Sequence, residues 1–136
     1  MNKCVVFDLD ETIGHFAQLY QISKIFETKK DIKLIKQHII SLYKHFYNIF
    51  RPGIFTLLAY TQFLKEKYNI ATVLYTNTIM NDIWISAFLE YTYSMVKLEF
   101  DFIIDLNSKC RTTTRKNLYD LYNCVSSLIS KYFIFF

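Results

Sequence analysis

The sequence predicts an α/β domain built on a parallel sheet, and two observations support this. Four short runs, at residues 4–7, 70–75, 100–106 and 132–136, are rich in apolar, β-branched and aromatic side chains, which is typical of strands buried on both faces of a sheet. The segments between these runs show helical periodicity, and strands that alternate with helices form right-handed crossovers. The 136 residues suffice for one domain with its own core.

The segments between the predicted strands carry helical patterns of different strength. Residues 15–30 carry a weak helical pattern, whereas residues 31–50 form a clear amphipathic helix. Its apolar stripe repeats at three- and four-residue steps and consists of Ile32, Ile35, Ile39, Leu42, Phe46 and Ile49. The helix ends at RPG, residues 51–53, and the proline suits the first turn of a helix over residues 54–68. Further helices are expected over residues 79–91 and 116–129.

Composition narrows the class of protein. Hydrophobic residues make up 52% of the chain and aromatic residues 18%, which excludes a disordered chain. The net charge of +4 is dispersed along the sequence, so no clear nucleic-acid-binding surface is expected. The densest basic stretch either faces an anionic ligand or is a solvated surface, and it contains Lys109, Arg111, Arg115 and Lys116.

The cysteine pattern and the length of the apolar runs bear on the compartment. Cys4, Cys110 and Cys124 are odd in number and include no CxxC pair, so we expect neither a disulfide framework nor a zinc site, and a reducing compartment is the simpler assumption. No uncharged apolar stretch reaches the roughly 20 residues of a membrane span. We therefore expect a soluble intracellular protein, cytoplasmic or nuclear, without membrane association.

Three acidic residues crowd the exit of the first predicted strand, in the run VVFDLDET of residues 5–12. Active sites of open parallel sheets lie beyond the carboxyl ends of the strands, and alternation gives Asp8 and Asp10 the same general direction. Two nearby carboxylates repel and need a cation or a shared proton, and Mg²⁺ prefers hard oxygen ligands of this kind. The alternative is a strand followed by an Asp-rich helix cap, with Thr12 as a local hydrogen-bonding residue.

The run DLDET of residues 8–12, after its hydrophobic strand, resembles motif I of the haloacid dehalogenase (HAD) superfamily, which has the form DxDxT. Three later segments resemble the CTD-phosphatase group of that superfamily, also called NLI-interacting-factor-like phosphatases. RPGIF at residues 51–55 is similar to the group's RPG segment, VLYTN at 73–77 to motif II, and Cys110 followed by KNL at 116–118 to motif III. The order and spacing of all four segments agree with the group.

The resemblance implies a HAD-like Rossmannoid fold, with helices on both faces of the parallel sheet, in a single domain over residues 1–136. Residues 14–50 would form a mainly helical insertion after motif I, a region that in this superfamily caps the site and selects substrates. The implied activity is Mg²⁺-dependent hydrolysis of a phosphomonoester, on phosphoserine or phosphothreonine in a protein or on a small molecule.

The resemblance also implies roles for individual residues. Asp8 would attack phosphorus and carry an aspartyl-phosphate, and Asp10 would act as general acid and base. The metal ligands would be Asp8 and the backbone carbonyl of Asp10. Thr76 and Asn77 would hydrogen-bond the transferred phosphoryl group, and Lys116 would offset negative charge on it and on Asp8.

Thr12 and Arg51 are expected to contact the substrate, again through the resemblance. The chain departs from the group in motif III, where KNL stands in place of KDL, and at Asn77, where alanine is common. The largest departure concerns motif IV, an apolar strand that ends in one or two aspartates that complete the Mg²⁺ shell. Residues 132–136 supply the strand but no acidic pair follows, and Asp105, at the end of an earlier apolar run, is the first candidate to replace it.

Two other interpretations follow from the missing acidic pair. The protein would then be a catalytically impaired pseudo-phosphatase, which binds a phosphorylated partner without hydrolysing it. Alternatively, it would be a truncated or frame-shifted product that lacks the end of the fold. The sequence predicts neither the substrate nor the oligomeric state.

Overall fold

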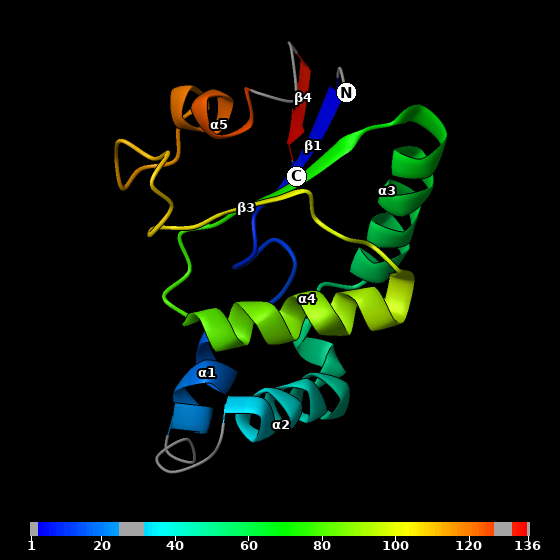
Figure 1. The fold of residues 1–136 in the computed structure, drawn as a ribbon. Helices are drawn as coiled ribbons and strands as arrows, with labels where there is room; N and C mark the ends of the chain where they lie inside the picture. The colour runs from blue at the N-terminus through cyan, green and yellow to red at the C-terminus, as the bar shows by residue number, and fades with distance from the viewer. Residues whose placement is uncertain (1–2, 25–31, 127–131, 136) are drawn as a thin grey trace.

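The computed structural model describes residues 3–24, 32–126 and 132–135, and it contains a sheet of four parallel strands (Figure 1). The spatial order of the strands is β3-β2-β1-β4, and their bounds are β1 Lys3–Phe7, β2 Ala71–Tyr75, β3 Phe102–Ile104 and β4 Tyr132–Phe135. In the centre, Val6 of β1 pairs with Val73 on one side and with Phe135 on the other. The predicted α/β class with a parallel sheet is therefore confirmed.

Five helices and one short 3₁₀ turn connect the described strands. Their bounds are α1 Ala17–Lys24, α2 Ile32–His45, the 3₁₀ turn η1 Tyr47–Ile49, α3 Ile54–Tyr68, α4 Asp82–Val96 and α5 Leu118–Val125. Each predicted helix is present, but the one expected over residues 31–50 ends at His45 and continues as η1. The predicted positions 25–31, 127–129 and 136 lie outside the described residues.

Helices cover both faces of the sheet, which explains why the two central strands, β1 and β2, are mostly apolar. Alternation directs Val5 and Phe7 of β1 into a core that they share with α4 and its neighbours, whereas Cys4 and Val6 point to the opposite face. On that opposite face α5 contributes two fully buried apolar side chains, Leu121 and Val125. Figure 1 shows the same arrangement, with α5 on one side of the strands and α3 and α4 on the other.

The insertion between β1 and α3 packs on the rest of the domain through α2. Ile39 and Tyr43 of α2 are fully buried, and the Tyr43 hydroxyl donates a hydrogen bond to the carbonyl oxygen of Trp84 in α4 at 3.2 Å. Ile35, Leu42 and Ile49 are partly buried against the same core, whereas the side chain of Ile32 is outside the description. The predicted stripe is wrong at Phe46, which is 42% exposed, because the helix ends one residue earlier.

The turn before α3 carries a conformation that its sequence explains. Gly53 has φ of 77°, in the left-handed region where only glycine is unstrained, and its carbonyl accepts the first helical hydrogen bond, from the Leu57 N–H, at 3.1 Å. Pro52 lies before the helix and not in its first turn, so its ring fixes the approach to α3.

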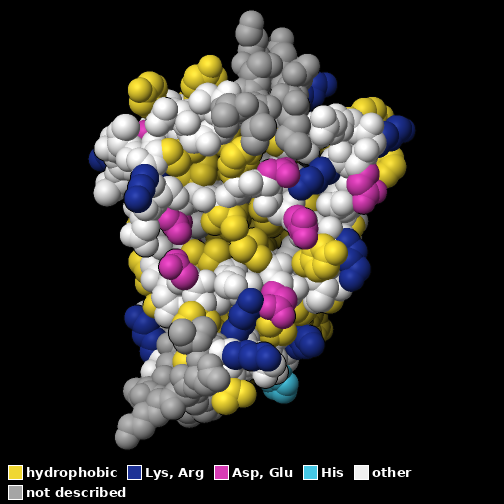
Figure 2. Space-filling model, viewed as in Figure 1, with side chains coloured by type: hydrophobic (Ala, Val, Ile, Leu, Met, Phe, Trp, Pro, Cys, Tyr) yellow, Lys and Arg dark blue, Asp and Glu magenta, His cyan; other side chains and the backbone are white. Residues whose placement is uncertain are grey.

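Both signs of charge lie on the face drawn in Figure 2, where acidic groups surround a central area of hydrophobic side chains and basic groups lie mostly towards the edges. Part of the exposed apolar surface comes from the edge strand β3, whose Ile103 is 40% exposed. Among the described residues, every helix is too short or too polar to cross a membrane.

Candidate active site at the ends of the first two strands

The loop after β1 presents the two motif I carboxylates while its apolar residues anchor it in the core. Leu9 and Ile13 are fully buried, and the Ile13 N–H donates to the Leu9 carbonyl at 2.9 Å. Glu11, between them, adopts a left-handed φ of 63°, which turns the chain back on itself. Asp8 and Asp10 are therefore half-buried on a tightly folded loop beyond the carboxyl end of the strand.

Arg51 holds this loop in place. Its Nε donates to the Thr12 carbonyl at 2.9 Å, and its Nη2 donates to the Glu11 carbonyl. Its own N–H donates to the Ile13 carbonyl at 2.9 Å. The substrate contacts that the sequence predicted for Arg51 and Thr12 stay a prediction; in the structure the arginine holds the loop, and Thr12 takes part through its backbone carbonyl.

Gly14 completes the attachment of the loop to the segment before α3. A Cβ atom at this position would lie 2.9 Å from the Ile49 carbonyl oxygen, and that oxygen accepts a hydrogen bond from the His15 N–H at 2.8 Å. A larger residue would therefore push the two segments apart. Apart from the scarcity of glycine in the chain, no sequence pattern indicates this close approach.

Lys116 reaches the nucleophile candidate from a distant part of the chain. Its Nζ forms an ion pair with Oδ1 of Asp8, the same oxygen that accepts a hydrogen bond from the Leu9 N–H at 2.8 Å. The ammonium group also lies 5.7 Å from the centroid of the Tyr75 ring. The structure thus brings together two residues that are 108 positions apart and that the sequence predicted to share one site.

The environment of Asp10 favours its protonated form. Burial raises the pKa of this carboxyl, and the negative charges of Asp8 and Glu11 raise it further. A hydrogen bond with the Thr78 hydroxyl and the positive charge of Lys116 oppose that rise. A raised pKa makes a carboxyl better suited to hold and donate a proton than one of ordinary acidity.

Thr76 and Asn77 follow β2 and lie at the same end of the sheet. Thr76 is fully buried; its N–H donates to the Ile104 carbonyl at 2.9 Å and its Oγ1 accepts from the Thr78 N–H at 3.0 Å. The Asn77 side chain is exposed, and its Nδ2 donates to the Thr114 carbonyl at 3.0 Å. The predicted phosphoryl-binding pair is thus placed near motif III, with the threonine hydroxyl engaged in a local turn.

Arg111 belongs to the site, although the sequence marked it only as part of a basic stretch. Its Nη1 donates to Oδ1 of Asn77 at 2.6 Å, and its guanidinium group lies 5.1 Å from the centroid of the Tyr75 ring. Its Nε is buried and has no hydrogen-bond partner among the described residues. Together with Lys116, it gives the site two cations that both contact Tyr75.

Asp120 of α5 organises the segment that carries these cations. This fully buried carboxylate accepts hydrogen bonds from the Thr112 hydroxyl at 2.6 Å, the Thr112 N–H at 2.9 Å, the Thr113 N–H at 3.3 Å and the Asn117 amide at 3.0 Å. These donors, the Thr112 hydroxyl above all, lower the pKa of Asp120 to about 2, against the opposing effect of burial. Asn117 also caps α5, because its Oδ1 accepts from the Asp120 N–H at 2.7 Å.

A disulfide bond joins the same segment to α5, contrary to the expectation from the cysteine count. Cys110 and Cys124 are bonded, with their Cα atoms 5.2 Å apart, and Cys4 is free and buried. The Asn123 amide reinforces the link by donating to the Cys110 carbonyl at 3.0 Å. Sequence reasoning missed the pair because it depends on how the irregular segment folds back onto α5.

The donor set for a metal is incomplete within the described part of the chain. Asp8 and Asp10 supply two carboxylates of the kind that Mg²⁺ prefers, but no group of three or more His, Cys, Asp or Glu side chains gathers among the described residues. Asp105 does not join them, since it lies at the end of the edge strand β3, where its Oδ1 accepts from the Asn107 N–H at 2.9 Å and the Ser108 hydroxyl at 3.2 Å.

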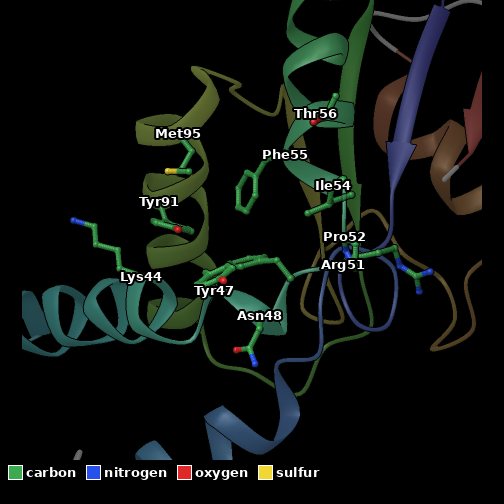
Figure 3. Close-up of a pocket in the computed structure, with 12 residues that line it drawn as sticks. Lys44, Tyr47, Asn48, Arg51, Pro52, Ile54, Phe55, Thr56, Tyr91 and Met95 are labelled. Atoms are coloured by element: carbon green, nitrogen blue, oxygen red, sulfur yellow. The ribbon is translucent and has the colours of Figure 1, made fainter.

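A mainly apolar hollow lies behind the Arg51 turn. It has a volume of about 630 Å³, and Phe55, Tyr91 and Met95 line it (Figure 3). Figure 3 shows that the Arg51 guanidinium points away from this hollow, towards the motif I loop. The hollow is therefore separate from the cluster of charged groups around Asp8.

Comparison of the chain with models of known protein families, with curated protein sequences and with solved structures finds no match.

Proposed function

We propose that this protein is a HAD-like, Mg²⁺-dependent phosphomonoester hydrolase that acts through an aspartyl-phosphate. The observation that carries the proposal is the ion pair between Asp8 and Lys116 at the carboxyl end of β1. Asp10, Thr76 and Asn77 lie at the same end of the sheet, so residues from three distant segments meet where an open parallel sheet places its active site. The arrangement suits phosphoryl transfer, in which positioning and charge neutralisation supply most of the rate acceleration.

The first half of the reaction uses both motif I carboxylates. Among the described residues, the hydrogen bonds to Asp8 fall on Oδ1, which leaves Oδ2 to attack phosphorus. A P–Oδ2 bond forms, the bond from phosphorus to the ester oxygen breaks, and that oxygen takes a proton from Asp10 and departs as the alcohol. The raised pKa of Asp10 favours the protonated form that this step needs.

The second half returns the enzyme to its starting state. Asp10, now ionised, takes a proton from water, the water oxygen bonds to phosphorus, and the P–Oδ2 bond breaks to release inorganic phosphate. Lys116 and Arg111 stabilise the negative charge on the phosphoryl oxygens in both halves. Mg²⁺ held by Asp8 and the Asp10 carbonyl would neutralise further charge on those oxygens, with its remaining ligands from water and substrate.

A second candidate function is phosphate-group recognition without hydrolysis. Two cations, Lys116 and Arg111, flank the site, whereas no group of three His, Cys, Asp or Glu side chains among the described residues is arranged to hold a metal ion. Such a site would bind a phosphorylated protein while holding Mg²⁺ weakly. The protein would then be a pseudo-phosphatase that presents or protects its phosphorylated partner.

The experiment compares Asp8→Asn with Asp105→Asn as a matched control. Both replace aspartate by its isosteric amide, but Asp105 serves a local turn, and asparagine can accept the same two hydrogen bonds there. We expect hydrolysis of p-nitrophenyl phosphate with MgCl₂ to fall to background in Asp8→Asn and to be unchanged in Asp105→Asn. Calorimetric titration with tungstate, a phosphate analogue, provides a readout that does not require turnover.

Each outcome distinguishes the candidates. Turnover that depends on Asp8 supports the hydrolase. Tungstate binding by a wild-type chain that lacks turnover supports the pseudo-phosphatase. A chain that neither binds tungstate nor turns over substrate contradicts both, as does turnover that Asp8→Asn leaves undiminished.

A further inference from the structure

We propose that Cys110 and Cys124 form a reversible thiol–disulfide site that controls how firmly residues 110–117 hold Arg111 and Lys116 in place. The consequence for phosphate binding rests on the proposed function; the effect on the segment itself does not. The inference starts from position: the disulfide is attached directly beside Arg111, and the segment that it anchors ends at the lysine that pairs with Asp8.

The disulfide links an irregular segment covalently to α5. Residues 105–117 form no helix or strand, and their ends join β3 to α5. The disulfide spans a sequence separation of 14 residues and so closes a loop that contains both Arg111 and Lys116. Without the disulfide, a loop of about 15 residues has more conformational freedom when it is open. This freedom would favour the open form over the closed form by about a hundredfold if nothing else held the loop.

The segment also has non-covalent attachments, and these make reduction a loosening and not an unfolding. The Asp120 carboxylate binds Thr112 and Thr113, the Asn123 amide binds the Cys110 carbonyl, and Arg111 binds Asn77. All these contacts persist without a bond between the two sulfur atoms. Because they share the restraint with the disulfide, we expect reduction to increase local opening about tenfold and to leave the fold intact.

The surroundings of the two cysteines favour exchange. Both Cys110 and Cys124 are partly exposed residues, unlike Cys4, which is fully buried. Cationic side chains flank Cys110 in sequence at Lys109 and Arg111, and nearby positive charge favours the thiolate that takes part in exchange. A low-molecular-weight thiol such as glutathione can therefore reach the bond.

The exchange balances with that thiol as the only co-reactant. A glutathione thiolate attacks one cysteine sulfur, the Cys110–Cys124 bond breaks, and a mixed disulfide forms with release of the other cysteine as a thiolate. A second glutathione then attacks the mixed disulfide. Overall the protein disulfide and two thiols give two protein thiols and glutathione disulfide, so the protein gains two electrons and two protons.

The test uses the full chain equilibrated with either glutathione or glutathione disulfide. Maleimide labelling under denaturing conditions counts thiols, with one expected in the oxidised protein and three in the reduced protein. Limited trypsin digestion then measures opening of the segment, through cleavage after Arg111, Arg115 and Lys116, with quenched samples reduced before mass spectrometry. We expect cleavage to be about tenfold faster in the reduced protein, and tungstate to bind several-fold more weakly.

Two variants serve as controls. Cys124→Ser should match the reduced protein under both conditions, and Cys4→Ala should respond as the parent does, since Cys4 is outside the pair. Three free thiols in the oxidised protein, or equal cleavage rates in the two states, would overturn the inference. A change in cleavage without any tungstate binding in either state would leave the switch standing and refute only the proposed function.

Discussion

Removing the ammonium group of Lys116 should separate its role in the site from its role in stability. We consider Lys116→Met, which keeps an unbranched, mostly apolar side chain one heavy atom shorter than lysine and removes the charge. The ion pair with Asp8 is about one-third exposed on each side, at 31% for the lysine and 37% for the aspartate. A pair with this exposure contributes about 0–1 kcal/mol to the free energy of unfolding.

The expected effect on catalysis is much larger than the effect on stability. A positioned charge that stabilises the transferring phosphoryl group is worth roughly 10²–10³ in kcat, so kcat/KM for p-nitrophenyl phosphate should fall by about that factor. The midpoint of thermal unfolding should fall by no more than about 4 °C, since about 1 kcal/mol produces a shift of that size in a domain of this length. Tungstate affinity should fall as well, in the same direction as turnover.

Lys65→Met provides a matched control because it breaks a comparable pair elsewhere. Lys65 binds Asp101 at 2.9 Å and the Glu99 carbonyl at 2.6 Å, with the pair 20% and 21% exposed. This variant should lose at least as much thermal stability as Lys116→Met and retain full kcat/KM and tungstate binding. If Lys116→Met instead loses stability like the control while binding and turnover are unaffected, Lys116 is a structural residue and our assignment is wrong.

Three further predictions concern acidity and packing. Asp10→Asn should abolish turnover yet raise thermal stability at pH 7. Burial and neighbouring carboxylates raise the pKa of Asp10, so its ionisation at pH 7 destabilises the folded state. Below about pH 4, where the carboxyl is protonated, the melting temperatures of the variant and the parent should converge. Asp120, with a pKa of about 2, should contribute stability that is lost as pH falls from about 4 to 2, a loss that urea titrations should find absent in Asp120→Asn. Leu42→Asp should destabilise by about 2–3 kcal/mol and Phe46→Asp by no more than about 0.5 kcal/mol in the same titrations, because only Leu42 packs on the core.

Contrary results would be informative in each case. A melting temperature of Asp10→Asn at or below that of the parent at pH 7 would mean that ionised Asp10 is already compensated. An acid limb of Asp120→Asn that matches the parent would remove Asp120 as its cause. Equal losses in Leu42→Asp and Phe46→Asp would mean that α2 does not pack as described.

The two central strands were predictable because β1 is buried on both faces from Cys4 to Phe7 and β2 along its whole length, so both carry mostly apolar side chains. The prediction over residues 70–75 matches Ala71–Tyr75, all five of which are buried. Helix ends were less accessible to sequence reasoning. Periodicity predicted that the second helix continues through Phe46 to residue 50, whereas in the structure it ends at His45. Phe50 instead packs in the core, with its ring centroid 5.7 Å from that of Phe16.

Sequence reasoning also located the groups that regular elements position. Asp8 and Thr76 directly follow β1 and β2, so strand order alone brings them to one end of the sheet. It missed contacts that irregular segments decide. The guanidinium of Arg51 holds two loop carbonyls, and nothing local in the sequence indicates which acceptors an arginine will reach. Arg111 and the Cys110–Cys124 bond depend in the same way on how residues 105–117 fold back.

The site therefore has two halves of different rigidity. Asp8, Asp10 and Thr76 are held by the central strands and by the clamped motif I loop, whose apolar residues are fully buried. The cations are held by a segment without regular structure, which depends on the Asp120 carboxylate and on one disulfide. Loosening that segment would leave the carboxylates in place but without their counter-charge, so affinity for an oxyanion would fall before the fold is lost. Perturbations at Lys116, Asp120 and Cys124 should accordingly weaken tungstate binding in common, and only the change at Lys116 should do so without making the segment more sensitive to trypsin.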